Sequence, residues 1–322
     1  MERSIDQTGA GAREDGGRGE ESQVTNVLSN PSFDDATRRE HLYRGDVMVY
    51  GASPATLALV DFTRGLVEEA FGDLDPETAQ HYMQVETFAA LLADLKPRFI
   101  HHPRCKELLP AVLEERGCDP RRTYFDVPRL RTSTSNDYLT TGIAYAFHPH
   151  RDTWYSAPMC QTNWWMPVYP VTADNVMAFH PKYMTQGVRN SSRRYDYAEW
   201  NRTSRFSAAA QIGKDTRDQP KPEEPVELDP QVRVVPEVGG MMVFSGNQLH
   251  SSVPNTSGRT RFSIDFRVVD IDDVEAGRGS RNVDSECSGT SLRDFRRCSD
   301  LAPMPEELAA RYDGVAVVGV PG

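Results

Sequence analysis

The 322-residue sequence has no long hydrophobic run. No apolar stretch approaches the roughly 18 to 20 residues that a membrane-spanning helix needs. Residues 1–35 also lack a hydrophobic segment of the signal-peptide kind. We therefore expect a cytoplasmic protein with no membrane partner.

Cysteine is scarce, and its spacing shows no closely spaced pairs. There are five cysteines, an odd number, and none forms a Cys-x-x-Cys motif. Small disulfide-stapled domains and structural zinc sites need an even set or closely spaced pairs. The sequence therefore indicates neither, and we expect reduced thiols at Cys105, Cys118, Cys160, Cys287 and Cys298.

An excess of positive charge is also missing. The chain has 36 Lys and Arg against 47 Asp and Glu, which gives a formal net charge of −11. A nucleic-acid-binding protein must neutralise phosphates, so this balance argues against one. A small-molecule partner is more compatible with it, and the sequence leaves the oligomeric state open.

The chain divides into a polar tail and one large domain. Residues 1–23 contain almost no large apolar side chain, so we expect a disordered tail. Residues 24–322 are predicted to form a single domain. Its first part, 24–120, is expected to be mainly helical support around a short strand at 47–50, with helices predicted at 54–71, 75–93 and 103–116.

The second part, residues 121–270, changes to short apolar runs separated by turn residues. This pattern is typical of a β-sandwich or barrel. It is interrupted by an irregular insert, 182–230, and followed by an extension, 271–322, that ends in a short predicted helix at 306–312. The predicted strands are 124–127, 129–132, 143–147, 160–166, 241–249 and 261–267.

Two histidines and one aspartate are placed where such strands end. His150 and Asp152 follow the strand-like run 143–147, and on an extended chain their side chains would point the same way. His250 ends another apolar run, 241–249. Two imidazoles and one carboxylate on one face of an ion leave coordination positions open, as in non-haem ferrous oxygenases.

The order and spacing of these residues resemble those of Fe(II)/2-oxoglutarate-dependent oxygenases, most closely the phytanoyl-CoA dioxygenase-like family. His-x-Asp, a distal His and an Arg eleven residues later all have counterparts here, over roughly residues 125 to 270. The resemblance implies a mostly β fold with flanking helices and a double-stranded β-helix core, the cupin-like jelly roll. It also implies that His150, Asp152 and His250 bind iron, and that Arg261 and Ser263 hold the far carboxylate of 2-oxoglutarate.

The same resemblance implies the chemistry. Fe(II), 2-oxoglutarate and O2 would together hydroxylate or otherwise oxidise a C–H bond of a small metabolite, with release of succinate and CO2. A natural-product tailoring step is the expected context. Related halogenases replace the carboxylate with a small residue, so Asp152 favours an oxygenase.

Two strands are predicted to carry a polar face at this site. In 161–165, Gln161, Asn163 and Trp165 alternate with other residues, and we expect Gln161 and Asn163 to face iron or cosubstrate; a plain strand face is the alternative. In 261–267, the odd positions are polar and the even ones apolar. Either a polar cavity or solvent could lie on the polar side.

Substrate contacts are predicted from aromatic and basic residues near the motif. The insert is expected to act as a lid, although its arginines could equally form a solvated surface. The candidate substrate-facing residues are His148, Trp154, Tyr155, Trp165, Arg189 and Arg193.

Two other functions fit parts of the pattern. An all-histidine site from His148, His150 and His250 would indicate a cupin-like isomerase or a dioxygenase that needs no cosubstrate. Pro149 is expected to break the strand between His148 and His150, which favours Asp152 as the third ligand. A β-sandwich binding module without a metal is the non-catalytic alternative.

Overall fold

The computed structural model describes residues 25–144 and 147–314. The predicted disordered tail at 1–23 lies outside these residues. Within them, no helix is both long and apolar enough to cross a membrane. The five cysteines are all buried and free, as predicted from their number and spacing.

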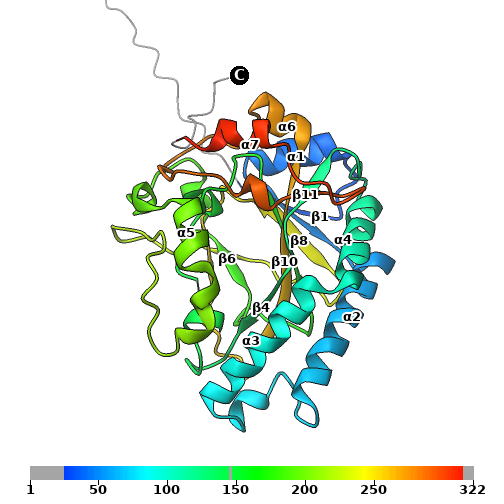
Figure 1. The fold of residues 1–322 in the computed structure, drawn as a ribbon, viewed down its shortest axis with the longest axis vertical. Helices are drawn as coiled ribbons and strands as arrows, with labels where there is room; N and C mark the ends of the chain where they lie inside the picture. The colour runs from blue at the N-terminus through cyan, green and yellow to red at the C-terminus, as the bar shows by residue number, and fades with distance from the viewer. Residues whose placement is uncertain (1–24, 145–146, 315–322) are drawn as a thin grey trace, which may run out of the picture.

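Two sheets form the β core (Figure 1). The major sheet has eight strands in the order β1-β2-β8-β5-β10-β3-β11, with β4 also pairing β10, and the minor sheet has the order β7-β6-β9. The bounds in the major sheet are β1 (Val27–Ser29), β2 (Val47–Tyr50), β3 (Thr123–Phe125), β4 (Arg129–Ser133), β5 (Thr162–Pro167), β8 (Met241–Ser245), β10 (Arg261–Asp270) and β11 (Arg296–Arg297). Those in the minor sheet are β6 (Met177–Phe179), β7 (Val232–Arg233) and β9 (His250–Ser252).

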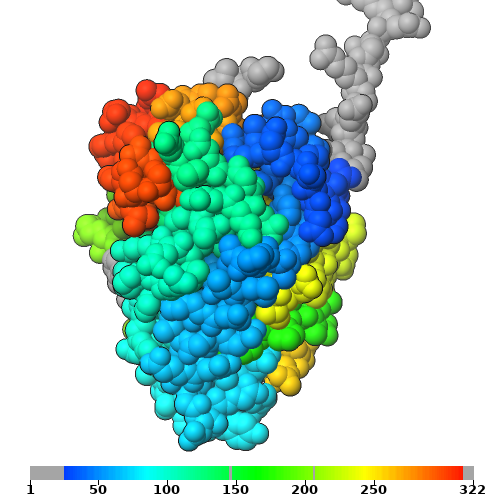
Figure 2. All heavy atoms as spheres, turned by 90° about the vertical axis from the view of Figure 1, so that its right-hand side faces the viewer, coloured from blue at the N-terminus to red at the C-terminus, as the bar shows by residue number. Residues whose placement is uncertain are grey.

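Helices flank this core, so the predicted fold class, a jelly-roll core with flanking helices, is confirmed. In the described residues they are α1 (Asp35–Tyr43), α2 (Pro54–Phe71), α3 (Val85–His101), α4 (Pro103–Glu115), α5 (Tyr197–Thr203), α6 (Ile271–Ala276) and α7 (Glu306–Ala309). Figure 2 shows the face on which α1 to α4, coloured blue to blue-green, lie together.

Helix α2 begins and ends where the sequence predicts. Ser53 and Thr56 form a capping box, Pro54 occupies the first turn, and Gly72 follows the last residue with a φ of 60°. The buried residues of α2 include Leu59, which packs in the main hydrophobic core. Helix α4 also matches its prediction to within one residue.

The helix predicted at 75–93 is wrong in its bounds. Residues 79–81 form a 3₁₀ turn, and α3 begins only at Val85 and continues to His101. The Gln80 side chain explains the break, because it accepts a hydrogen bond from the Ser135 backbone N–H (2.8 Å) and donates one to its carbonyl (3.0 Å). A tertiary contact therefore overrides the local helical pattern.

The strand predicted at 143–147 is also wrong where it can be described. Gly142–Ala144 is a 3₁₀ turn, and residues 145 and 146 lie outside the described chain. Gly142 has a φ of +61°, and a Cβ there would come within 2.3 Å of the Ala208 carbonyl oxygen. The close approach of the insert thus needs glycine in a left-handed conformation, which a strand does not provide.

Strand β10 separates two environments. Its even residues Phe262, Ile264 and Phe266 belong to the hydrophobic core that also contains residues of α2 to α4. Its odd residues Arg261, Asp265 and Arg267 line a cavity. Of the two interpretations of its alternating pattern, the polar cavity is the one observed.

One carboxylate in the extension ties three segments together. Asp284 accepts hydrogen bonds from the Arg151 Nε (3.0 Å), the Trp154 Nε1 (2.7 Å) and the Val188 backbone N–H (2.9 Å). Arg151 is completely buried. Asp284 therefore compensates a buried charge beside the metal motif and also anchors the start of the insert.

We expect Asp284→Ala to lower the free energy of unfolding by about 3 to 5 kcal/mol, because it leaves the buried Arg151 charge without a partner. Urea unfolding followed by circular dichroism measures this effect. Asp272→Ala is the matched control: its partner Arg122 is 44% exposed, and a pair at that exposure contributes about 1 kcal/mol or less. Equal losses in the two variants would contradict the role given to Asp284.

Candidate metal centre

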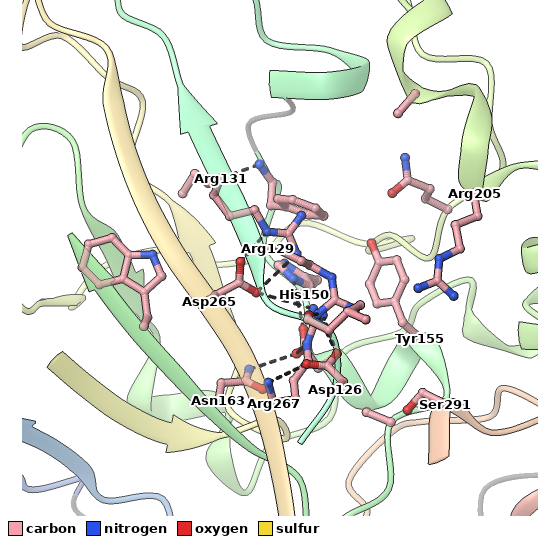
Figure 3. Close-up of a pocket in the computed structure, with 18 of the residues that line it drawn as sticks. Asp126, Arg129, Arg131, His150, Tyr155, Asn163, Arg205, Asp265, Arg267 and Ser291 are labelled. Carbon is pink, nitrogen blue, oxygen red and sulfur yellow. Dashed lines mark hydrogen bonds and ion pairs between the residues drawn. The ribbon is translucent and has the colours of Figure 1, made fainter. Parts of the chain in front are cut away.

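A cavity of about 660 Å³ opens beside the inner face of the major sheet. Strands β4, β5 and β10 form one wall, and the insert and the extension contribute to the other. Figure 3 shows Arg129, Arg131 and Asp265 on the strand side, with Tyr155 and Arg205 facing them. His150, Asp152 and His250 lie in the lining of this cavity.

These three residues form the one group of potential metal ligands found in the described part of the chain. One ligand atom from each lies within 4.8 Å of the others, and all three residues are buried. The His150 Nε2 and Asp152 Oδ1 atoms are 3.6 Å apart. Metal–ligand bonds to histidine and carboxylate are about 2.0 to 2.2 Å long, so one ion between these two atoms can reach both.

The backbone places the two histidines directly opposite each other, with ring centroids 4.4 Å apart. His150 donates its backbone N–H to the His250 carbonyl (2.9 Å), and His250 donates back to the His150 carbonyl (3.0 Å). This reciprocal pair is an isolated antiparallel bridge. The expected strand at His-x-Asp is therefore replaced by a single bridge, and Asp152 begins a 3₁₀ turn immediately after it.

Both imidazoles are oriented for metal binding. The Nδ1 atoms of His150 and His250 lie 2.9 Å from the carbonyl oxygens of His148 and Gln248. Because a carbonyl can only accept, each Nδ1 carries the hydrogen and donates, which leaves the Nε2 lone pair for a metal. Burial, and next the neighbouring His150, lower the pKa of His250 to about 3, so its imidazole is neutral.

One carboxylate oxygen of Asp152 is available to a metal ion, and the other accepts hydrogen bonds from protein side chains. Its Oδ2 accepts hydrogen bonds from Asn163 Nδ2 (2.9 Å), Gln161 Nε2 (3.0 Å) and Arg267 Nε (3.3 Å). Burial alone would raise the pKa of this carboxyl, but Arg267 holds it well below its usual range. A charged carboxylate with Oδ1 directed toward the histidines is the result.

Gln161 and Asn163 therefore line the cavity and donate to the Asp152 carboxylate, and their facing iron or cosubstrate stays a prediction. Gly246 makes the approach of Gln161 possible, because a Cβ at this position would lie 3.1 Å from the Gln161 Nε2. The backbone N–H of Asp152 also donates to the Gly246 carbonyl (2.8 Å). The chain is thus fixed on both sides of the carboxylate.

Arg261 and Ser263 provide unused polar atoms in the same interior. Among the described side chains, the Nε of Arg261 and the Oγ of Ser263 are buried polar atoms without a hydrogen-bond partner. Arg261 donates to the Asn175 carbonyl (2.7 Å) and lies over the ring of Trp165, 5.6 Å from its centroid. Burial lowers the pKa of Arg261 to about 10. Arg261 lines the cavity and Ser263 does not, so Arg261 is the one of the two that a polar ligand in the cavity would meet.

Several predicted substrate residues are elsewhere. Trp154 is fully buried against Tyr183, Val188 and Leu249, so its expected place in the pocket is wrong. Arg189 and Arg193 are exposed and bind the backbone and the carboxylate of Glu223, respectively. Neither residue lines the cavity, so their expected place beside the substrate is also wrong.

His148 is separate from the metal group. Its Nε2 lies 2.8 Å from the Pro220 carbonyl oxygen, so it donates to the insert and cannot bind an ion with that atom. Burial, and next His150, lower the pKa of His148 to about 4. Tyr155 and Trp165, in contrast, do line the cavity.

Sequence reasoning missed the charged residues around the ligands. Arg267 bridges Asp152 and Asp126, and Asp126 in turn pairs with Arg129 (2.6 Å). The alternation of polar and apolar residues in 261–267 could have placed Arg267 on the polar side of the strand. No comparable signal marked Asp126 or Lys96, because their place in the cavity depends on strand pairing and helix docking.

Comparisons with known proteins give weak likenesses. No family model matches the sequence, and no curated protein matches it. Among solved structures, EvdO2 from Micromonospora carbonacea var. aurantiaca is 13% identical, with 76% of this chain and 94% of that chain covered and a TM-score of 0.40. AviO1 from Streptomyces viridochromogenes Tue57 is 15% identical, with coverage of 74% and 96% and a TM-score of 0.38. SnoN, described as a non-heme alpha ketoglutarate dependent epimerase from nogalamycin biosynthesis, is 12% identical, with coverage of 73% and 84% and a TM-score of 0.36. Similarity this low carries no functional argument. The chemistry of this chain therefore rests on its own group of potential metal ligands, His150, Asp152 and His250.

Proposed function

We propose that this protein is a non-haem Fe(II)- and 2-oxoglutarate-dependent oxygenase acting on a small metabolite. One observation carries the proposal: a buried His150–Asp152–His250 triangle shares a cavity with the Arg261 guanidinium, whose Nε has no hydrogen-bond partner. Two imidazoles and one carboxylate suit ferrous iron and leave positions for further oxygen ligands.

The residues around the triangle fit a dicarboxylate as well as a metal. The buried Arg261 has no carboxylate partner within ion-pair distance in the described chain, and its Nε and the Ser263 Oγ are unsatisfied. A guanidinium presents parallel N–H groups that match a carboxylate, and Ser263 adds a hydroxyl donor. Arg261 and Ser263 would hold the far carboxylate of 2-oxoglutarate, while its near end would reach the metal.

The other side chains hold and shield the ligands. His150 and His250 are fixed by their Nδ1–H bonds, and Asp152 is kept ionised by Arg267 and oriented by Gln161 and Asn163. When bound, ferrous iron would allow dioxygen to oxidise 2-oxoglutarate to succinate and CO2 with one oxygen atom and a C–H bond of the substrate with the other. A hydroxylation in natural-product tailoring is the reaction that we propose.

Anaerobic addition of Fe(II) and 2-oxoglutarate to the full-length protein tests the proposal. We expect a visible charge-transfer absorption that requires both components, and succinate formation after air is admitted. An absorption change with Fe(II) that 2-oxoglutarate does not alter would favour a metalloenzyme without this cosubstrate. Absence of any metal binding would favour the non-catalytic binding module.

The insert supplies an aromatic wall to the cavity, and we propose that it is the lid. Tyr195, Tyr197 and Trp200 line the cavity, and the Tyr195 and Trp200 rings are 5.9 Å apart. Such a wall keeps water from the reacting centre. Its aromatic part comes from the segment that contains α5.

We expect Trp200→Ala to raise succinate formation in the absence of substrate severalfold, because water and small reductants would enter the opened cavity. Oxygen consumption and succinate analysis with Fe(II) and 2-oxoglutarate alone measure this uncoupled reaction. Arg202→Ala is the control on the same helix, since its partner is the exposed Glu199 and it does not line the cavity. An unchanged rate in Trp200→Ala would show that the insert does not protect the site.

A further inference from the structure

The cavity is positively charged although the protein is acidic. Its lining contains seven Lys or Arg residues and three aspartates, against a net charge of −11 for the whole chain. Five of the seven have an aspartate within ion-pair distance; these are Arg129, Arg131, Arg205, Arg217 and Arg267. The other two have no such partner among the described residues. One is buried and one is half-buried, and a charge withdrawn from water without a partner is costly.

The two remaining cations are Arg261 and Lys96. No carboxylate in the described part of the chain lies within 4.0 Å of either one, since the neighbouring Asp265 is bound by Arg131 (2.6 Å). The proposed function assigns Arg261 to 2-oxoglutarate. That assignment leaves Lys96 without an anion.

Lys96 projects from α3 into the edge of the cavity. Its ammonium donates to the Ile143 carbonyl, which uses one of its three donors. Burial, and next the Arg131 guanidinium, lower the pKa of Lys96 to about 7. An anion bound here would restore the charged form and fill the remaining donor positions.

The opposite side of the cavity is aromatic. Tyr155 and Tyr195 meet edge to face with their centroids 5.5 Å apart, and Trp200 extends this surface. Figure 3 shows Tyr155 across the cavity from Arg131, the neighbour of Lys96. Ring surfaces of this kind bind planar or apolar groups.

We propose that the cavity binds a second anion besides 2-oxoglutarate: a substrate whose carboxylate pairs with Lys96 and whose aromatic body packs on Tyr155, Tyr195 and Trp200. The substrate class is thus an aromatic carboxylic acid. The inference rests on the proposed function only in giving Arg261 to the cosubstrate.

Binding of matched acids and amides tests this inference. The probes are benzoate, phenylacetate and 3-phenylpropionate with their uncharged amides, titrated calorimetrically into full-length protein loaded anaerobically with Fe(II) and 2-oxoglutarate. We expect at least one acid to bind about tenfold or more tightly than its amide, the effect of one charge-assisted contact. If no acid binds more tightly than its amide, the inference is overturned without any substitution.

Variants then assign the preference to a residue. Lys96→Met is expected to remove it, Lys96→Arg to retain part of it, and the exposed Lys106→Met on α4 to leave it unchanged. The half-saturating 2-oxoglutarate concentration should be the same in all four proteins. A preference that survives Lys96→Met, or a Lys96→Met variant that weakens 2-oxoglutarate instead, would also overturn the inference. If the wild type shows a Lys96-dependent preference for acids but never binds 2-oxoglutarate, the proposed function fails and the anion site remains.

Discussion

His250→Ala is expected to abolish turnover and to weaken metal binding by more than about a hundredfold, the upper end of the loss when only an outer-shell partner is removed. The substitution deletes one of three proposed ligands whose atoms lie within 4.8 Å of one another. The backbone bridge to His150 does not involve the side chain, so the local fold should persist. Metal analysis after reconstitution with Fe(II), together with succinate release, measures both effects. His150→Ala and Asp152→Ala should behave in the same way.

His148→Ala is the matched control for these ligand variants. This histidine also lies beside His150, with ring centroids 6.1 Å apart, but its Nε2 is bonded to the Pro220 carbonyl. Metal content should therefore be unchanged. The opposite result, with metal lost in His148→Ala and retained in Asp152→Ala, would restore the all-histidine site. Circular dichroism of each variant shows whether a lost activity reflects a lost fold.

Arg261→Met is expected to raise the 2-oxoglutarate concentration for half-maximal turnover by roughly two orders of magnitude, because a charge-assisted bidentate contact contributes a few kcal/mol. Metal binding without cosubstrate should stay the same, since Arg261 contacts none of the three ligands. The fold should tolerate the change, because the guanidinium is buried without a carboxylate and methionine can still pack on Trp165.

Arg259→Met is the control for charge at the same end of β10. Arg259 is 55% exposed in its side chain and pairs with Glu77 at 3.2 Å, away from the cavity lining. We expect its 2-oxoglutarate dependence to match that of the wild type. An equal rise in the half-saturating 2-oxoglutarate concentration in the two variants would mean that the loss of any positive charge nearby weakens binding. The far carboxylate of 2-oxoglutarate would then be bound by a residue other than Arg261.

The parts of the fold that were predictable are those in which local pattern and tertiary packing agree. Helix α2 has its cap, its first-turn proline and its apolar face within its own sequence. The alternation in 261–267 likewise predicted which side of β10 is polar, and the structure places the helical core against Phe262, Ile264 and Phe266.

The parts that were not predictable depend on distant partners. The strand expected at 143–147 fails at Gly142–Ala144 because the insert approaches Gly142, and no local signal indicates that contact. Trp154 was predicted to face the substrate because it is an aromatic residue near the motif. Its actual partner, Asp284, is 130 residues away in sequence. The position of Lys96 in the cavity was not predicted for the same reason, because it depends on where α3 packs against the sheet.

The position of Asp284 has a consequence for the order in which the protein is made. The ligand segment around Arg151 and the insert at Val188 are both held by this one carboxylate from the extension. During synthesis, His150, Asp152 and His250 all leave the ribosome before it does. The growing chain thus has all three metal ligands before it has the residue that neutralises the charge buried beside them. We therefore expect a metal to bind in the final geometry only after Asp284 has been synthesised and has docked on Arg151 and Val188.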